Sequence, residues 1–266
     1  MINIFMNIWC FGDSWTWGAE LWDDNICPLP IYKEKMGMID DGVDSWMYIP
    51  ENRNYVTSNR WTGILESDYG HTVRNFGENG ASNNQILETL IHTLEHETTL
   101  PELIIISWTS QYRYTERVDD WKRKENSYSK HKSMMTPNWR DVTFEDNFFH
   151  IVNTAFSVAH EHNLPMLNIN SFFNNKVCNK FPKHIRFTDE TLLSVASNGT
   201  ITNIPKTDWH IEFKRFYLKI LGKIIKESLD MSTIDMSNFK DGGHPNEQGH
   251  KLIAKYINEV ITNENI

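Results

Sequence analysis

Residues 11–18 read FGDSWTWG, and this stretch decides the fold that we expect. It ends an apolar run over residues 2–11, which is typical of a buried strand that ends at Gly12. Ser14 then stands in a turn that opens a helix predicted over residues 14–22, at the edge of the sheet where α/β proteins bind ligands. Two interpretations stay open. In the first, Ser14 is a nucleophile. In the second, Asp13 or Ser14 only caps the helix, and this second interpretation is the better one for the stretch taken alone.

Strands and helices alternate along the rest of the chain. Further strands are predicted at 71–76, 102–108 and 164–170, with a weak one at 233–236, and helical stripes are predicted at 60–66, 84–96, 148–162, 213–225 and after Pro245. This alternation predicts one α/β domain over residues 1–266, a three-layer α/β/α sandwich with a mostly parallel sheet of about five strands. Clear periodicity is missing from three stretches, which we interpret as irregular insertions at 23–58, 112–146 and 171–210.

Composition narrows the class of protein. A net charge of −9 argues against a general binder of nucleic acid or of an anionic membrane, because phosphate binding needs clustered Lys and Arg. The three cysteines form no CxxC pair, which suits a reducing compartment. The N-terminus has no basic leader region, and no apolar run approaches the ~20 residues of a membrane span. We therefore expect a cytoplasmic protein without nucleic-acid or membrane partners, of open oligomeric state.

A second motif stands near the other end of the chain. Residues 241–250 read DGGHPNEQGH, with Asp241 and His244 close together just before the helix that Pro245 begins. Such a turn can place a carboxylate where it orients an imidazole, which gives a serine its general base. The alternative is a simple turn with a surface histidine. Each motif is weak alone, but Ser14, Asp241 and His244 together have the composition of a catalytic triad.

The motifs also resemble those of a known family. FGDSWTWG resembles the first block, GDSxTxG, of the GDSL/SGNH hydrolase superfamily, NFGENGASN at 75–83 resembles its second block, and DGGHPNEQG resembles its fifth. The resemblance covers most of the chain outside the three insertions. It implies a flavodoxin-like fold and hydrolysis of an ester through an acyl-enzyme on Ser14. It further implies that Asp241 and His244 complete the triad, that the N–H group of Gly80 donates to the oxyanion, and that no metal or organic cofactor is needed.

The third block departs from the family's pattern. The family usually has Gly-x-Asn-Asp after the third strand, and that asparagine helps to fill the oxyanion hole, whereas here LIIIS runs into WTSQYRYT. The nearest alignment puts Ser110 at the asparagine, with Thr109 and Gln111 beside it, and Asn83 or Asn84 could also reach in. The departure allows a replaced donor, a slower enzyme or a binding protein with a relic site. We expect the first, with Ser110 in the oxyanion hole.

Several side chains near the predicted strand ends are candidates to contact the substrate: Asp13, Trp15, Trp108, Thr109, Gln111 and Arg113. Aromatic residues make up 12% of the chain, and the aromatic-rich insertions favour a carbohydrate O-acetyl ester within a small-molecule or glycan substrate. One alternative is a lipid or small-ester acylhydrolase. The other is a non-catalytic glycan- or protein-binding module on the same fold, for example a virion-associated component if the chain is phage-encoded.

The remaining histidines receive plainer interpretations. His92 and His96 have the i, i+4 spacing of a metal-binding pair, but two histidines fall short of the usual four ligands, so we expect them to face solvent and predict no metal site. His250 is predicted to be a surface residue and not a second base.

Overall fold

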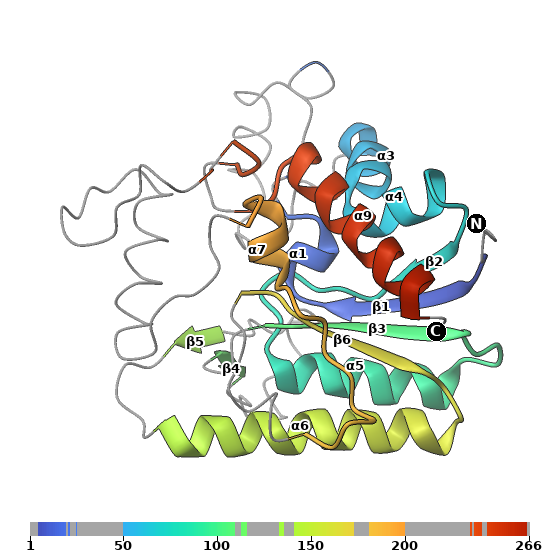
Figure 1. The fold of residues 1–266 in the computed structure, drawn as a ribbon, viewed down its shortest axis with the longest axis vertical. Coiled ribbons are helices and arrows are strands. Elements are labelled where there is room, and N and C mark those ends of the chain that lie inside the picture. The colour runs from blue at the N-terminus through green and yellow to red at the C-terminus, as the bar shows by residue number, and fades with distance from the viewer. Residues whose placement is uncertain are drawn as a thin grey trace, which may run out of the picture.

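Four parallel strands form the centre of the protein in this computed structural model, which describes residues 5–19, 21, 25, 50–109, 113–115, 133–135, 141–172, 181–199, 235, 237–240 and 244–264 (Figure 1). The strands are β1 (Asn7–Gly12), β2 (Thr72–Asn75), β3 (Leu103–Trp108) and β6 (Met166–Asn170). Their order in the sheet is β2-β1-β3-β6, the flavodoxin-like order. The predicted α/β class with a parallel sheet is confirmed. A fifth strand is not, because residues 233–236 lie mostly outside the described residues.

The register of the sheet brings the carboxyl ends of the strands together. Gly12 of β1 lies opposite Ser107 of β3, and Ser107 lies opposite Ile169 of β6. All six residues of β3 are buried, as expected of a central parallel strand covered on both faces. Residues that directly follow β1 and β3 therefore emerge at one edge of the sheet.

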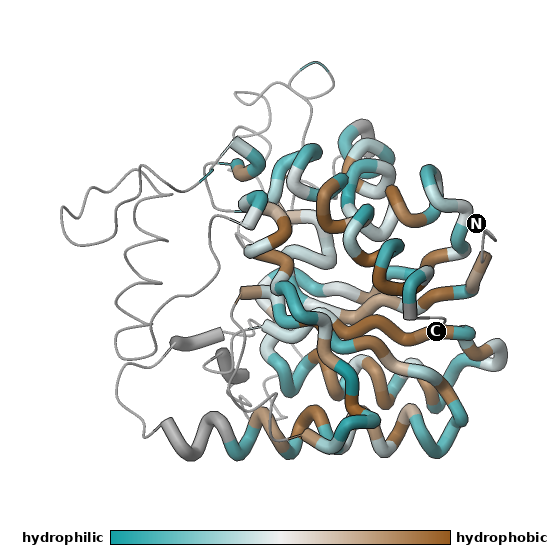
Figure 2. Tube along the Cα trace, viewed as in Figure 1, coloured by the Kyte–Doolittle hydropathy of each residue, from teal (hydrophilic) through white to brown (hydrophobic). Residues whose placement is uncertain are grey.

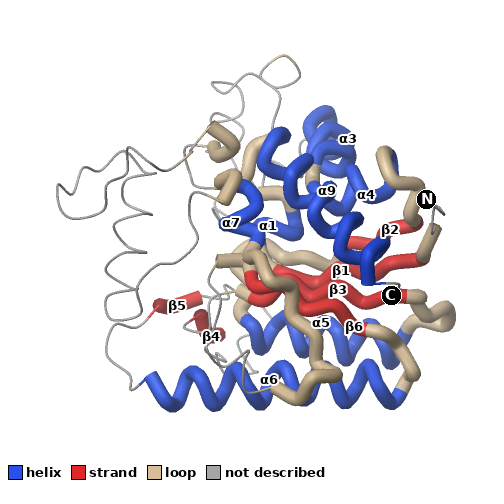
Figure 3. The backbone as a smooth tube through the Cα atoms, viewed as in Figure 1, coloured by secondary structure: helices blue, strands red, loops and turns tan. Residues whose placement is uncertain are grey.

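Helices cover both faces and complete three layers, as predicted (Figures 1 and 3). One face carries α1 (Ser14–Trp17), α3 (Pro50–Asn59), α4 (Trp61–Ser67), α7 (Leu192–Ala196) and α9 (Glu247–Glu264). The other face carries α5 (Asn83–His96) and α6 (Asp141–Glu161). Strand alternation supplies both cores: Ile8 and Cys10 of β1 pack towards α4 and α9, whereas Trp9 and Phe11 pack towards α5 and α6.

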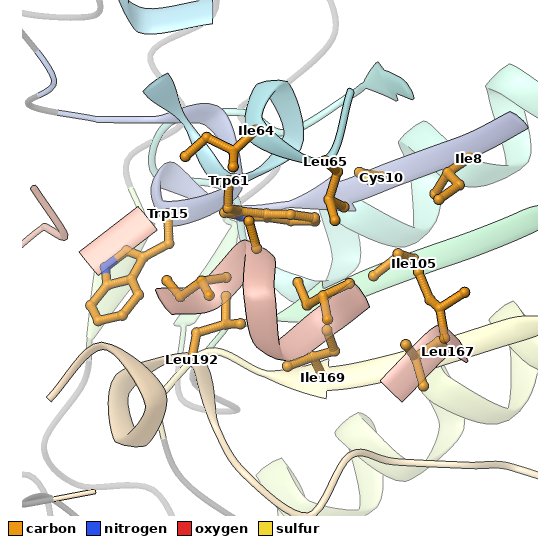
Figure 4. Close-up of a cluster of buried hydrophobic side chains, with 14 of the residues drawn as sticks. Ile8, Cys10, Trp15, Trp61, Ile64, Leu65, Ile105, Leu167, Ile169 and Leu192 are labelled. Atoms are coloured by element: carbon orange, nitrogen blue, oxygen red, sulfur yellow. The ribbon is translucent and has the colours of Figure 1, made fainter. Parts of the chain in front are cut away.

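Hydrophobic residues follow this layering. Figure 2 shows them concentrated along the strands and on the helix faces that meet the sheet. Figure 4 shows the cluster on the α9 face, where Trp61 of α4 lies over the strands and Trp15 of α1 occupies one end. Among the described residues, no helix combines the length and the apolar composition that a membrane crossing would require.

The prediction that residues 23–58, 112–146 and 171–210 are irregular was partly wrong. α3 lies in 23–58 and α7 in 171–210, while 112–146 contains an antiparallel pair of short strands, β4 (Arg113–Thr115) and β5 (Ser133–Met135), and the start of α6. α3 escapes a periodicity search because few of its side chains, such as Asn52 and Val56, are buried. The helix predicted at 14–22 spans only 14–17, since Gly18 ends it with φ of +93°. The helix predicted at 213–225 lies outside the described residues.

Candidate active site

Ser14 lies in a tight turn at the carboxyl end of β1. Asp13 caps α1, its carboxylate accepting a hydrogen bond from the N–H of Trp15 at 3.1 Å. Gly12 leaves room for this turn, because a Cβ at that position would lie 2.2 Å from Oγ1 of Thr16. The structure therefore combines the two interpretations. Asp13 caps the helix, and the side chain of Ser14, the next residue, is not used for capping.

The decisive contact of the site joins the two ends of the chain. Nε2 of His244 lies 3.0 Å from Oγ of Ser14, although 230 positions separate the residues. Ser14 is 4% exposed, and His244 is partly buried. With the proton of the imidazole on Nδ1, the serine hydroxyl donates to Nε2, which is the arrangement of a nucleophile with its general base. Asp241, the predicted orienter, lies outside the described residues, so its role stays a prediction.

The residues around His244 hold it against Ser14 through backbone contacts. The carbonyl of His244 accepts from the N–H of Lys240 at 2.8 Å, and Pro245 forms a bridge with Phe239. Asn246 caps α9, its side-chain oxygen accepting from Gln248 N at 3.0 Å and Gly249 N at 3.1 Å.

Gly249 is required by a close backbone approach in the same place. A Cβ there would lie 2.5 Å from the carbonyl oxygen of Asn238. The HPNEQG sequence thus encodes a loop-to-helix corner whose first residue is the histidine.

The second sequence block packs against the serine turn. The side-chain amide of Asn75 donates to the carbonyl of Thr16 at 2.6 Å, and Glu78 N donates to the carbonyl of Gly12 at 3.0 Å. Gly77 is also needed here, since a Cβ would lie 2.8 Å from the backbone nitrogen of Trp17. Gly80, the predicted oxyanion donor, adopts φ of +76° with open space where its Cβ would be. These contacts hold the turn that carries Gly80 next to the turn that carries Ser14.

The third block meets the second through one asparagine. Asn83 bonds both backbone groups of Thr109: its Oδ1 accepts from Thr109 N at 2.9 Å, and its Nδ2 donates to Thr109 O at 3.2 Å. Ser82, just before it, caps α5 in a reciprocal capping box with Gln85. The Asn83 side chain, which the sequence left open as an oxyanion donor, therefore holds the end of β3. Ser110, the aligned candidate, lies outside the described residues.

The predicted substrate contacts lie in different surroundings. Trp15 is 2% exposed and packs on Phe172, and Trp108 is fully buried, its Nε1 donating to Asn168 Oδ1 at 2.8 Å. Both indoles therefore belong to the hydrophobic core, and Asp13 is fully buried as a cap. Thr109 lies buried at the end of β3. Gln111 lies outside the described residues, and Arg113 is described only through its backbone in β4.

His250 is fully buried, so its prediction as a surface residue was wrong. Its Nδ1 accepts from the N–H of Trp61 at 3.2 Å, which satisfies the first free N–H group of α4. Burial, together with the charges of His244 and Arg60, lowers its pKa from 6.5 to about 3. His250 is therefore neutral and structural, which the sequence did not signal because its burial depends on α4.

The sequence also did not indicate the contacts that Arg60 and Glu247 make. Burial lowers the pKa of Arg60 to about 10, and its guanidinium donates to the carbonyl of Trp17 at 3.3 Å, behind the serine turn. Glu247, at the start of α9, accepts from the hydroxyl of Tyr55 at 2.6 Å and lies 3.4 Å from Nζ of Lys240. These contacts tie α3 to the loop that carries His244. No local sequence pattern pairs residues so far apart.

Several solved structures are similar to this chain over most of its length. One similar structure is a member of the lipolytic protein G-D-S-L family from Veillonella parvula, with 16% identity, a TM-score of 0.41 and coverage of 96% of this chain and 97% of that one. Another is a mutant of an acetyl-xylooligosaccharide esterase from Geobacillus Stearmophilus, with 14% identity, a TM-score of 0.42 and coverage of 98% and 96%.

A third similar structure is the lipase/acylhydrolase from Enterococcus faecalis, with 14% identity, a TM-score of 0.36 and coverage of 97% and 95%. No protein-family model and no curated protein sequence matches the chain. The contact between Ser14 and His244 is therefore the main indication of what this chain does.

Proposed function

We propose that the protein is a serine ester hydrolase that acts through an acyl-enzyme on Ser14. The single observation that carries this proposal is the 3.0 Å contact between Oγ of Ser14 and Nε2 of His244 at the carboxyl edge of a parallel sheet. A hydroxyl and an imidazole 230 positions apart form this pair only if the fold brings them together. Helix capping explains the position of Asp13, but it does not explain why His244 contacts Ser14.

The reaction follows from these two groups. Oγ of Ser14 attacks the ester carbonyl while Nε2 of His244 takes the hydroxyl proton, and the same proton then passes to the departing alkoxide, which leaves as an alcohol. Water attacks the acyl-enzyme with His244 again as the base, and this releases the acid and restores the serine. Asp241 would orient the imidazole. The N–H groups of Ser14 and Gly80 would donate to the oxyanion.

For the substrate we propose an O-acetyl ester of a carbohydrate. Four of the ten tryptophans fall in the predicted insertions, at positions 46, 121, 139 and 209. Indole faces pack well against sugar rings, because they are large, flat and only partly polar. A lipid acylhydrolase would be expected to carry a long apolar lid, whereas residues 23–58 are polar and interrupted by prolines.

Ser14→Ala tests the reaction, with the exposed Ser157→Ala of α6 as the matched control. The wild-type protein and Ser157→Ala should hydrolyse p-nitrophenyl acetate and react with a fluorophosphonate probe, and Ser14→Ala should do neither. Labelling that persists in Ser14→Ala, or wild-type protein without labelling and turnover, would contradict the proposal.

The substrate class is tested separately, by acetate release from an acetylated oligosaccharide compared with hydrolysis of p-nitrophenyl esters of longer acids. Preference for long acyl chains would favour the lipid acylhydrolase. Glycan binding without any turnover that depends on Ser14 would favour the binding module.

A further inference from the structure

The hydroxyl of Thr109 is buried, and it has no hydrogen-bond partner among the described residues. Thr109 directly follows the last residue of β3, it is 4% exposed, and its Oγ1 accepts or donates no hydrogen bond among the residues that the structure describes. A buried hydroxyl left unpaired destabilises a protein, because it has lost its hydrogen bonds to water. Such a group calls for an explanation, and a bound ligand is one.

Its position relates it to Ser14. Ile105 of β3 packs towards α9, and continued alternation of side chains would put Ser107 and then Thr109 on the same face. Gly12 lies opposite Ser107 in the register, and a Cβ on Gly12 would lie 3.0 Å from Cβ of Ser107. Ser14 and Thr109 each come two residues after this pair, where the chain leaves the sheet at the carboxyl ends of β1 and β3.

The backbone of Thr109 is fixed to the turn that carries Gly80. Asn83, three residues after Gly80, bonds both the N–H and the carbonyl of Thr109, as a neighbouring strand would do. Asn83 also begins α5 beside the capping box of Ser82 and Gln85, so that it stands on a rigid element. A donor attached to this frame would keep its place during a reaction, as electrostatic catalysis requires.

We infer that the hydroxyl of Thr109 is the side-chain donor to the oxyanion, the role that the sequence alignment gave to Ser110. This inference rests on the proposed ester hydrolysis. When Ser14 attacks, the carbonyl oxygen gains the negative charge, and the hydroxyl of Thr109 donates a hydrogen bond to it beside the N–H groups of Ser14 and Gly80. The hydroxyl keeps its proton throughout. The oxyanion is then the partner that Oγ1 does not find among the residues that the structure describes.

Two substitutions test this role in the full-length protein. Thr109→Val keeps the shape and removes the hydroxyl, and it should lower kcat for p-nitrophenyl acetate by roughly 10²–10³-fold with little change in KM. Thr109→Ser keeps the hydroxyl and should retain most of the activity. The melting temperature of Thr109→Val should equal or exceed that of the wild type, because the substitution removes a buried polar atom that has no partner in the described part of the chain. A purely structural hydroxyl would give the opposite change in stability.

Each other outcome has a definite meaning. Full activity in Thr109→Val, or a loss of kcat accompanied by a lower melting temperature and shared by Thr109→Ser, would overturn the inference while leaving the hydrolase standing. A loss of kcat in Ser110→Ala but not in Thr109→Val would restore the donor that the alignment suggested. Wild-type protein that neither hydrolyses the ester nor takes up the fluorophosphonate at Ser14 would refute the hydrolase itself, and the role of Thr109 with it.

Discussion

Acid should destabilise this protein through His250, and His250→Asn should remove that effect. The imidazole is fully buried in α9, and its Nδ1 accepts the N–H of Trp61 at 3.2 Å. Burial first, and then the charges of His244 and Arg60, lower its pKa from 6.5 to about 3. An asparagine places its side-chain oxygen near the position of Nδ1, so the variant can keep the cap on α4 while it loses the titrating group.

The sign and size of the effect follow from proton linkage. Between pH 6.5 and pH 3 the unfolded chain binds a proton at this residue that the folded protein does not, so acid favours unfolding. The stabilisation is fully present above the unfolded pKa and decreases as the pH falls. Each pKa unit corresponds to ~1.4 kcal/mol of unfolding free energy. The protein therefore loses about 2 kcal/mol of stability at pH 5 and about 5 kcal/mol below pH 3.

Urea unfolding followed by tryptophan fluorescence between pH 7 and pH 5 measures this difference. The wild type should lose about 2 kcal/mol more than His250→Asn over that range. The variant is also expected to be less stable at pH 7, because a smaller side chain leaves a cavity, but the test concerns only the pH dependence. His162→Asn, which removes an exposed histidine, is the control and should behave as the wild type does. Equal losses in the wild type and His250→Asn would refute the reasoning.

Three further predictions concern the frame around Ser14 and His244. Asp13→Ala should lower stability by about 1 kcal/mol, because it removes the cap of α1, whereas Asp13→Asn should keep most of it, and thermal unfolding distinguishes them. Gly249→Ala should lower stability by about 1–3 kcal/mol in urea unfolding, since its Cβ would meet the carbonyl of Asn238 at 2.5 Å, and unchanged stability would show that the corner can open. Tyr55→Phe should cost about 1 kcal/mol, because it removes the 2.6 Å hydrogen bond to Glu247, and a melting temperature equal to the wild type's would contradict that contribution.

The sequence predicted the four described strands of the parallel sheet, and it predicted β3 most clearly. β3 consists of six buried residues, and such a run is visible without any knowledge of its neighbours. α5 was predicted within one residue from its apolar stripe, and the structure adds a local capping box of Ser82 and Gln85 at its start. α3 was missed, since its contact with the rest of the protein rests on few buried side chains and leaves no periodic pattern.

The candidate site divides in a similar way. Ser14, Gly80 and His244 could be named as candidates from the sequence, because each lies in a short motif whose glycines, proline and caps shape its own turn. Trp15 and Trp108 were expected near the substrate, but the structure places them in the core, where neighbouring elements cover them completely. A sequence shows that an indole is apolar, but it does not show what packs against it.

Local sequence is enough to specify a serine after a capped turn, a histidine before a capped helix, and most of the strands and helices that carry them. Which of these groups meet depends on the packing of the whole fold. It set Ser14 beside His244, buried His250 under α4, and buried the hydroxyl of Thr109 without a hydrogen-bond partner among the described residues, next to the frame of Asn83. The physical reason is distance along the chain. Caps and turns form between residues a few positions apart, whereas burial and pairing at the sheet edge depend on elements up to 230 positions apart.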